Sequence, residues 1–373
     1  MGGMASLFAG LLAGVLADRL RRRPLMVVAD VLSALLILAV PTVWALGSLV
    51  MFHLYLVEFL VGGLTTVSYV AGQSYLPVVV GRGYLVEANG KLRANEALAQ
   101  VAGPSFAGGL AQFVAAPLVL VLDSLSFLAS AILVGSIRTV EPGRRRQPDD
   151  ESTGAFGRAA RETAEGLRWI LGSPLLRAVL ATSVSLSLFS GVFAALFVLF
   201  AGRGLGLSPA AIGAVLAFQG IGSILGALLS GRISHRLETG PSLVLSAAGM
   251  GLGWLVLPLA GIFGSPPAPT LVFGLFLSGF CYVVYVVQAV SLRQRLTPDE
   301  ILGRVNAGAV ALIFAATPVG SLLGGFLAES LGARAALALG AMVGASGFLW
   351  TLFSPVRRLR TPPIRSRSSV KER

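Results

Sequence analysis

The chain carries the stretch GVLADRLRRRPL, residues 14–25, between two long apolar runs. The stretch holds one acid and four arginines within a dozen residues. Such a polar connector cannot lie in the hydrocarbon of a bilayer, whereas the apolar runs beside it are long enough to cross one. Because arginines concentrate in cytoplasmic connectors, the stretch predicts a short cytoplasmic loop between two membrane-spanning helices.

The composition of the chain points to the same class of protein. Of its 373 residues, 55% are hydrophobic and 12% charged, and the mean hydropathy is +0.82. A soluble domain of this composition would expose a large apolar surface. No run alternates polar and apolar residues strictly with period two, so the sequence predicts an all-α polytopic bundle. The predicted spans, each of roughly 20 residues, lie at 1–17, 25–46, 50–71, 96–116, 118–137, 175–200, 209–230, 242–262, 269–290, 307–328 and 333–353.

The basic residues predict the orientation of the bundle. Of the 29 Lys and Arg residues, only Arg203 and Arg334 fall in connectors on one side of the membrane, so the other side is predicted to be cytoplasmic. We expect a monomeric multi-pass protein of the bacterial cytoplasmic membrane, with its net charge of +12 facing anionic lipid headgroups and no nucleic-acid partner. The predicted cytoplasmic connectors are 18–24, 80–95, 138–174, 231–241 and 291–306.

The residues that carry metal, cofactor or covalent chemistry are sparse. The chain has one cysteine, Cys281, and two histidines, His53 and His235, which stand far apart in the sequence. This predicts neither a disulfide nor a metal site. No phosphate-cradling glycine loop, nucleophile elbow or hydrolytic triad is present, so we expect no cofactor and no enzymatic activity.

The long polar connector at 138–174 divides the chain into two halves that repeat each other. We expect an N-terminal transmembrane half at 1–137, a cytoplasmic central loop at 138–174, a C-terminal half at 175–353 and a basic tail at 354–373. The repeat pairs Gly10 with Gly222, and further along it pairs Asn89 with Asn306. Parallel repeats of six helices are typical of one large class of transporters.

The alignment of the two halves also makes a prediction about the start of the chain. If Gly10 corresponds to Gly222, the counterpart of the helix predicted at 175–200 would precede Met1. The repeat therefore predicts twelve helices in the intact protein, of which this chain carries eleven. A truncated or mis-started chain and a genuine eleven-helix protein both remain open.

The loop at 14–25 resembles the signature loop of the major facilitator superfamily, with Gly14, Asp18 and Arg19 in the expected places. The run AQVAGPSFAGG, 99–109, resembles a helix 5 motif of the efflux branches, and the stretches at 73–77, 121–131 and 296–307 resemble the branch of enterobactin and macrolide exporters. The resemblance implies a secondary active exporter that works by alternating access and proton antiport.

The resemblance also implies where moving contacts lie. The signature loop implies a latch between helices that breaks during transport, and a static salt bridge is the alternative. The candidate latch residues are Gly14, Asp18, Arg19, Arg22, Arg23 and Asp30. In the helix 5 motif, proline removes a helical hydrogen bond and glycine removes side-chain bulk, so the motif predicts a kinked, closely packed helix that forms a gate or simply packs. Its residues are Gly103, Pro104, Gly108 and Gly109.

Glu58 is the sharpest candidate for coupling or substrate contact. It lies nine residues into a span, roughly 14 Å deep at 1.5 Å per residue, where a carboxylate is expected to face water, hold a proton or make a packing hydrogen bond. Asp123 matches a feature of the exporter branch, and holding a helix hairpin is its alternative. The polar residues Gln100, Gln219, Gln288 and Asn306 either line a cavity or join helices.

These observations predict export of a small molecule. Because few charged residues are expected deep in the bundle, neutral or cationic lipophilic cargo is favoured. The branch often carries an acid near the position of Tyr69, and its absence here leaves the coupling ion open. Two alternatives remain, a non-transporting interaction or regulatory subunit and an importer of a small nutrient.

Overall fold

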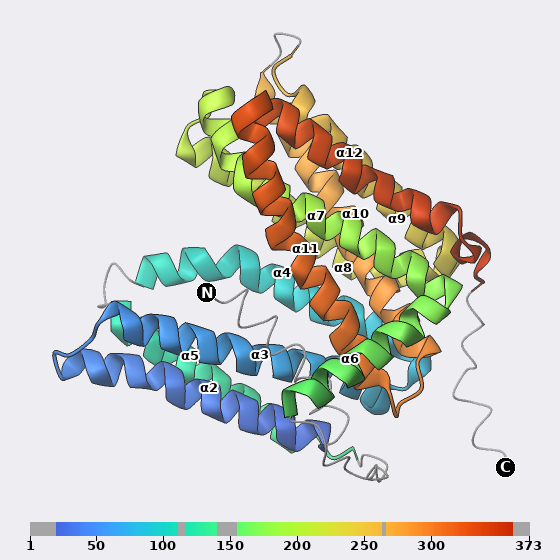
Figure 1. The fold of residues 1–373 in the computed structure, drawn as a ribbon. Coiled ribbons are helices and arrows are strands. Elements are labelled where there is room, and N and C mark those ends of the chain that lie inside the picture. The colour runs from blue at the N-terminus through green and yellow to red at the C-terminus, as the bar shows by residue number, and fades with distance from the viewer. Residues whose placement is uncertain (1–19, 111–115, 140–154, 263–265, 361–373) are drawn as a thin grey trace.

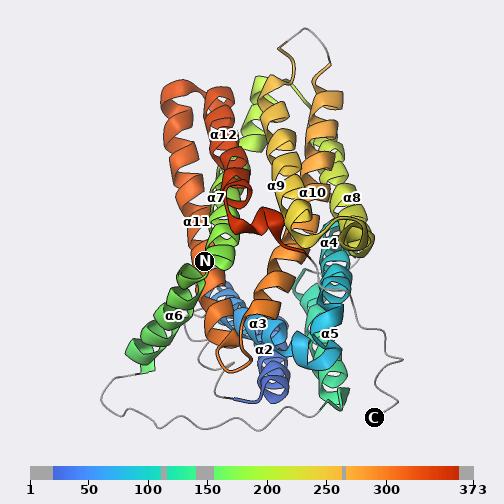
Figure 2. The same cartoon turned by 90° about the vertical axis from the view of Figure 1, so that its right-hand side faces the viewer.

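The computed structural model describes residues 20–110, 116–139, 155–262 and 266–360, and these form eleven α-helices without strands. Figures 1 and 2 show the front-half helices grouped below the back-half helices. The predicted all-α polytopic bundle is confirmed. The front half consists of α2 (Arg22–Ala45), α3 (Met51–Val80), α4 (Leu85–Leu110) and α5 (Ala116–Ser136). The back half consists of α7 (Pro174–Leu199), α8 (Pro209–Arg236), α9 (Thr239–Val256), α10 (Pro267–Leu296), α11 (Leu302–Leu331) and α12 (Ala333–Leu352).

Nine helices of the described chain are long and apolar enough to cross a membrane. They correspond to nine of the predicted spans, and the run predicted at 1–17 lies outside the described residues. The remaining predicted span, 96–116, belongs to α4, whose first half carries charged residues. Large apolar side chains such as Ile132, Leu322 and Phe326 are more than 70% exposed. An apolar surface of this kind fits lipid contact and a multi-pass membrane protein.

The helices are longer than predicted at the end of the bundle that carries the basic connectors, here called the basic end. The expected connector 80–95 shrinks because α3 reaches Val80 and α4 starts at Leu85. The expected connector 291–306 shrinks to the loop 297–301. The prediction was wrong here because a hydropathy count stops at the first charges. Helical hydrogen bonds continue beyond the apolar layer, since main-chain groups need partners there too.

The central connector was predicted as a loop, but it contains the amphipathic helix α6 (Ala155–Gly172). This helix packs on the start of α11. A Cβ on Gly166 would lie 2.3 Å from the carbonyl oxygen of Arg304, and the Arg304 guanidinium pairs with Glu165 at 2.8 Å. A cavity of about 500 Å³ lies between the two helices. The connector is therefore attached to the back half.

Small residues bring helices of the back half together. On α8, a Cβ on Gly222 would lie 2.3 Å from the carbonyl oxygen of Phe276, and one on Gly226 would lie 2.4 Å from that of Phe280. These glycines belong to the repeated segment. They allow α8 and α10 to touch backbone to backbone, which side chains would prevent.

The aromatic residues of α7 are packed within the back half. Phe189 and Phe197 are almost fully buried, and the ring of Phe189 lies 4.2 Å from that of Trp254.

The two halves meet along α4 and at the basic end. Helix α4 packs on α8 and α10, and α3 contacts α11. The approach is close, because a Cβ on Gly90 would lie 2.6 Å from the Ser230 hydroxyl. This arrangement brings the start of α4 and the end of α3 against the loop between α10 and α11.

Candidate functional site

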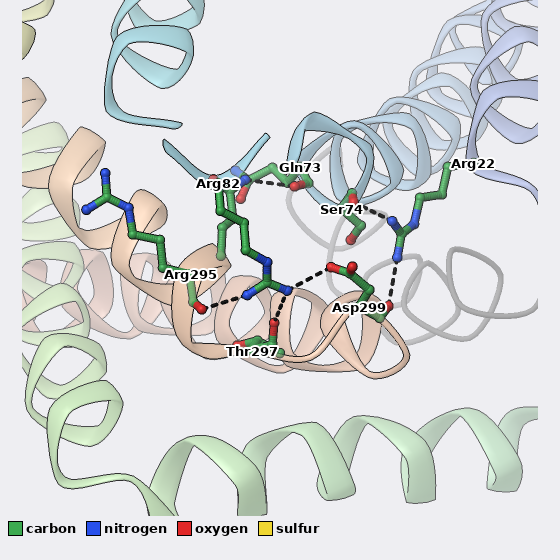
Figure 3. Close-up of polar contacts among 8 residues, drawn as sticks. Arg22, Gln73, Ser74, Arg82, Arg295, Thr297 and Asp299 are labelled. Carbon is green, nitrogen blue, oxygen red and sulfur yellow. Dashed lines mark hydrogen bonds and ion pairs between the residues drawn. The ribbon is translucent and has the colours of Figure 1, made fainter. Parts of the chain in front are cut away.

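A layer of polar side chains joins the two halves at the basic end. We call this layer the polar gate, and Figure 3 shows its outer part. Its residues come from α2, α3, α4 and the short turn between α3 and α4 in the front half, and from α10, α11 and their connecting loop in the back half. They are Arg22, Gln73, Ser74, Arg82, Asn89, Ser291, Arg293, Gln294, Arg295, Thr297, Asp299 and Asn306.

The outer part of the gate rests on two arginines, Arg82 at the end of α10 and Arg22 at the loop that follows this helix. Arg82 donates to the carbonyl oxygens of Arg295 (2.6 Å) and Thr297 (2.9 Å) and pairs with the Asp299 carboxylate at 2.9 Å. Arg22 donates to the Ser74 carbonyl at 2.6 Å and to the Asp299 carbonyl at 2.9 Å (Figure 3). The last carbonyls of a helix lack partners within it, and the Arg82 guanidinium supplies donors to those of α10 from the other half.

The first inner contact of the gate joins α4 to α10. The amide of Asn89 donates to the Ser291 hydroxyl at 3.0 Å and to the Gln294 side-chain oxygen at 2.8 Å. Gln294 in turn donates to the Gln73 carbonyl at 2.7 Å, and its side chain is fully buried. The chain of bonds therefore crosses the interface twice.

The second inner contact joins α3 to α10 and α11. Asn306 donates to the Ser74 hydroxyl at 3.1 Å and accepts from Arg293 at 2.8 Å, while Arg293 also donates to the Gln73 side chain at 3.0 Å. All these bonds join one half to the other or brace a residue that does. They have to break if the two halves separate at the basic end.

A second group of side chains lies one helical turn further from the basic end. Tyr69 precedes Gln73 by one turn on α3 and Arg93 follows Asn89 by one turn on α4, a displacement of about 5–6 Å in each case. Arg93 donates to the Tyr69 hydroxyl at 2.7 Å and to the Glu96 carboxylate at 2.5 Å. We call Tyr69, Arg93, Glu96 and Tyr282 the arginine–tyrosine cluster.

Tyr282 brings the back half into this cluster. It lies on α10 within electrostatic range of both Arg93 and Glu96. It is nevertheless 47% exposed, and the side chain of Glu96 is 42% exposed. Beyond the closed gate, the surface between the halves therefore stays accessible.

The predicted latch residues divide into three groups. Gly14, Asp18 and Arg19 lie outside the described residues. Arg22 is part of the polar gate. Arg23 donates to the carbonyl oxygen of Gly135 on α5, and the Asp30 carboxylate accepts bonds from Ser68 (3.2 Å) and Ser130 (2.7 Å). Arg23 and Asp30 therefore hold the front half together.

The other predicted residues lie apart from one another. Glu58 is exposed on the first third of α3, and Asp123 is exposed on α5. The helix 5 motif lies within α4, together with Gln100, and consists of Gly103, Pro104, Gly108 and Gly109. The surroundings of these residues lie outside the described part of the structure.

The last three candidates lie on back-half helices. Gln219 is half-buried on α8, where its carbonyl oxygen would lie 2.2 Å from a Cβ on Gly279. Gln288 on α10 is fully buried, and its amide atoms have no hydrogen-bond partner in the described part of the chain. Asn306 is the one of these that reaches the gate.

Several gate and cluster residues escaped the sequence analysis because they fell in regions predicted as connectors. Arg82, Asn89, Arg93 and Arg293 all lie in 80–95 or 291–306. The repeat that pairs Asn89 with Asn306 was the available signal. The expectation of neutral or cationic cargo rested on the absence of basic residues deep in the bundle. The structure places Arg93 and Arg293 between the halves near the basic end.

Two helical halves that join at one end are an architecture found in many secondary transporters. A family model described as "Transmembrane secretion effector" matches residues 2–372. The chain therefore belongs to this family of the major facilitator superfamily, which confirms the family predicted from the signature loop.

Two relatives and two solved structures illustrate the likeness. The multidrug efflux pump Tap of Mycolicibacterium fortuitum is 26% identical over 90% of this chain and 80% of its own. The enterobactin exporter EntS of Citrobacter koseri is 26% identical over 96% and 83%. The human organic anion transporter MFSD10 matches with a TM-score of 0.75 at 20% identity over 94% and 82%, and a bacterial homologue of ferroportin with 0.72 at 14% identity over 94% and 87%. The structures show the same fold.

Proposed function

We propose that the protein exports small molecules across the bacterial cytoplasmic membrane by alternating access. The observation that carries this proposal is the polar gate. It closes the basic end with bonds between the halves, while the arginine–tyrosine cluster beyond it stays accessible. The relatives named as exporters support export over import.

The gate has the physical properties that a reversible closure needs. Each of its hydrogen bonds replaces a bond to water, so its net contribution is about 0.5–1.5 kcal/mol, or 1.5–3 kcal/mol where a charge takes part. On opening, the carbonyl oxygens of Arg295 and Thr297 can return to water. The two states can then differ by only a few kcal/mol, which a ligand or an ion can overcome.

We further propose that proton influx drives export, with the protein acting as a monomer. Glu58 is the carboxylate proposed to take part, because it lies inside a membrane span where ionisation is unfavourable unless water or a partner is present. Replacement of Glu58 by Gln should abolish the dependence of transport on an imposed pH gradient. An unchanged dependence would remove Glu58 from the mechanism.

The experiment that tests export uses inverted membrane vesicles from an efflux-deficient bacterium. Uptake of the dyes fluorescein and ethidium is followed after acidification of the vesicle interior. We expect one of the dyes to accumulate in vesicles that contain the protein, and a protonophore to abolish the accumulation. Accumulation in whole cells instead would indicate import, and no transport in either direction would favour the interaction or regulatory subunit.

The orientation has its own test. After replacement of Cys281 by Ser, single cysteines are placed at Ala210 and at Glu300, exposed positions at opposite ends of the bundle. An impermeant maleimide should label Ala210→Cys in intact cells and Glu300→Cys only in inverted vesicles. The reverse pattern would place the basic end outside.

A further inference from the structure

We infer that the arginine–tyrosine cluster binds an acidic group, a carboxylate or a phenolate, on an aromatic small molecule. The inference names the substrate class for the proposed exporter and therefore rests on that proposal. It departs from the neutral or cationic cargo expected from the sequence.

The first argument is the unused hydrogen-bonding capacity of Arg93. A guanidinium group has five N–H donors. Arg93 gives one to the Tyr69 hydroxyl and one to the Glu96 carboxylate, and its others have no partner among the described residues. The side chain is only 20% exposed, so it is largely withdrawn from water. Open donors on a partly desolvated guanidinium form a binding site for a carboxylate or phenolate oxygen.

The second argument is the local charge. Arg93 and Arg293 lie within electrostatic range of each other, and the described contacts of Arg293 are the neutral amide oxygens of Gln73 and Asn306. Glu96 is the carboxylate that contacts Arg93. Two cations against one anion leave an excess of positive charge between the halves. Charged groups between membrane helices are unfavourable without a partner or a function, and an acidic ligand would neutralise the excess.

The third argument is the pair of tyrosines beside the arginine. The Arg93 guanidinium lies 5.9 Å from the centre of the Tyr69 ring, and Tyr282, on α10 of the other half, lies within electrostatic range of Arg93. Tyr282 keeps 47% of its surface exposed. An exposed ring next to a cation suits an aromatic acid, which can stack on the ring while its anion reaches the guanidinium. Such a ligand would contact both halves at once.

Glu96 has a distinct role in this arrangement. It lies three residues after Arg93 on α4 and occupies one of its donors, and its side chain is 42% exposed. Glu96 would therefore compete with the ligand for Arg93. Removing the charge of Glu96 should strengthen the binding of an anion, whereas removing that of Arg93 should weaken it.

The test measures fluorescein binding to the purified full-length protein by fluorescence anisotropy, with ethidium as the cationic comparison. We expect Arg93→Gln to weaken fluorescein binding about tenfold or more, since a hydrogen bond to a charged group contributes roughly 1.5–3 kcal/mol. Glu96→Gln should strengthen it, Tyr282→Ala should weaken it, and Tyr282→Phe should weaken it less. Arg177→Gln, an exposed arginine on α7, is the matched control and should bind as the wild type does.

Two results would overturn the inference. One is fluorescein affinity equal in the wild type and in Arg93→Gln. The other is no fluorescein binding to the wild type at millimolar concentration, with or without ethidium binding. Elution volume and thermal melting verify that each variant is folded, and Glu96→Gln supplies a gain that misfolding cannot mimic. Binding without transport would refute the proposed export and leave the site standing, whereas transport independent of Arg93 would do the opposite.

Discussion

Arg82 ties the front half to the end of α10 and to the loop that follows it. It reaches two carbonyl oxygens at the end of α10 and the Asp299 carboxylate. The ion pair itself is exposed, with side-chain exposures of 41% and 53%, so water screens it. The charge-assisted bonds to the carbonyls carry most of its contribution to the closed state.

Replacing Arg82 by Gln should therefore favour opening of the basic end. Loss of these bonds should destabilise the closed state by about 1–2 kcal/mol, a factor of roughly 5–30 in the equilibrium. The measurement is the maleimide labelling rate of a cysteine placed at the buried Ser291, which should rise by that factor. Arg232→Gln, an exposed arginine of α8, is the control and should leave the rate unchanged. A rate insensitive to Arg82 would exclude it from the closure.

Asp30 is either a latch residue or a structural support, and a substitution can distinguish the two roles. Its two oxygens accept bonds from Ser68 and Ser130 within the front half. Asp30→Ala should lower the stability of the protein by about 1–3 kcal/mol, because two half-buried hydroxyls lose their acceptor. Thermal melting measures this loss. The maleimide labelling rate of a cysteine placed at Ser291 should be the same with Asp30→Ala as without it. Faster labelling would instead assign Asp30 to the latch.

At the scale of elements, backbone contacts between helices define the rigid parts of the molecule. Helices α8 and α10 touch at Gly222 and Gly226, and α7 touches α11 at Gly191, where a Cβ would lie 1.9 Å from the Thr317 carbonyl oxygen. Side chains cannot be inserted at such contacts without separating the helices. The back half therefore behaves as one packed unit, in contrast to the hydrogen-bonded interface at the gate.

A pair of glycines on α8 tests this packing. Gly222→Ala should lower thermal stability by about 1–3 kcal/mol through overpacking against α10. Gly213 lies on the same helix with nothing within 4 Å of its Cβ position. Gly213→Ala should leave stability unchanged or raise it by up to about 1 kcal/mol, since alanine is the better helix former. Equal effects of the two substitutions would contradict the close contact of α8 and α10.

At the scale of the whole molecule, two kinds of contact hold the halves together. The interface of α4 with α8 includes the close contact at Gly90, whereas the contact of α3 with α10 and α11 is hydrogen-bonded. Hydrogen bonds exchange readily with water when a surface opens. Under the proposed alternating access, the halves would part at the gate while each half stays intact.

A covalent lock across the gate should stop transport. Ser74 and Asn306 lie on opposite halves and share a hydrogen bond of 3.1 Å. In a background with Cys281→Ser, the pair Ser74→Cys and Asn306→Cys should cross-link with a short bifunctional thiol reagent that contains a disulfide. Dye transport in inverted vesicles should be lost and should return on reduction. The single-cysteine variants are controls, and full transport by the cross-linked protein would refute opening at this end.

Much of the fold could be predicted because its signals are local. The arginines of residues 14–25, the hydropathy of nine spans and the halves marked by Gly10 and Gly222 are all read along the chain. Helix α6 carried a local signal too, an amphipathic pattern within a charged connector, which a search for apolar runs passes over. The candidate site was harder to predict, since Arg93 and Arg293 resemble connector residues in the sequence alone.

The sequence by itself determined that this protein is a two-part helical bundle in a membrane, with its basic connectors predicted on the cytoplasmic side. Hydropathy and charge act on each segment separately, so their effect needs no knowledge of the partners. Only the tertiary structure decided that Arg82 pairs with Asp299, 217 residues further along the chain. The same holds for the hydrogen bond of Arg93 to Tyr69 and for the position of Tyr282 within electrostatic range of both. Packing of distant helices creates those contacts, because a polar group buried between them must find its partner there.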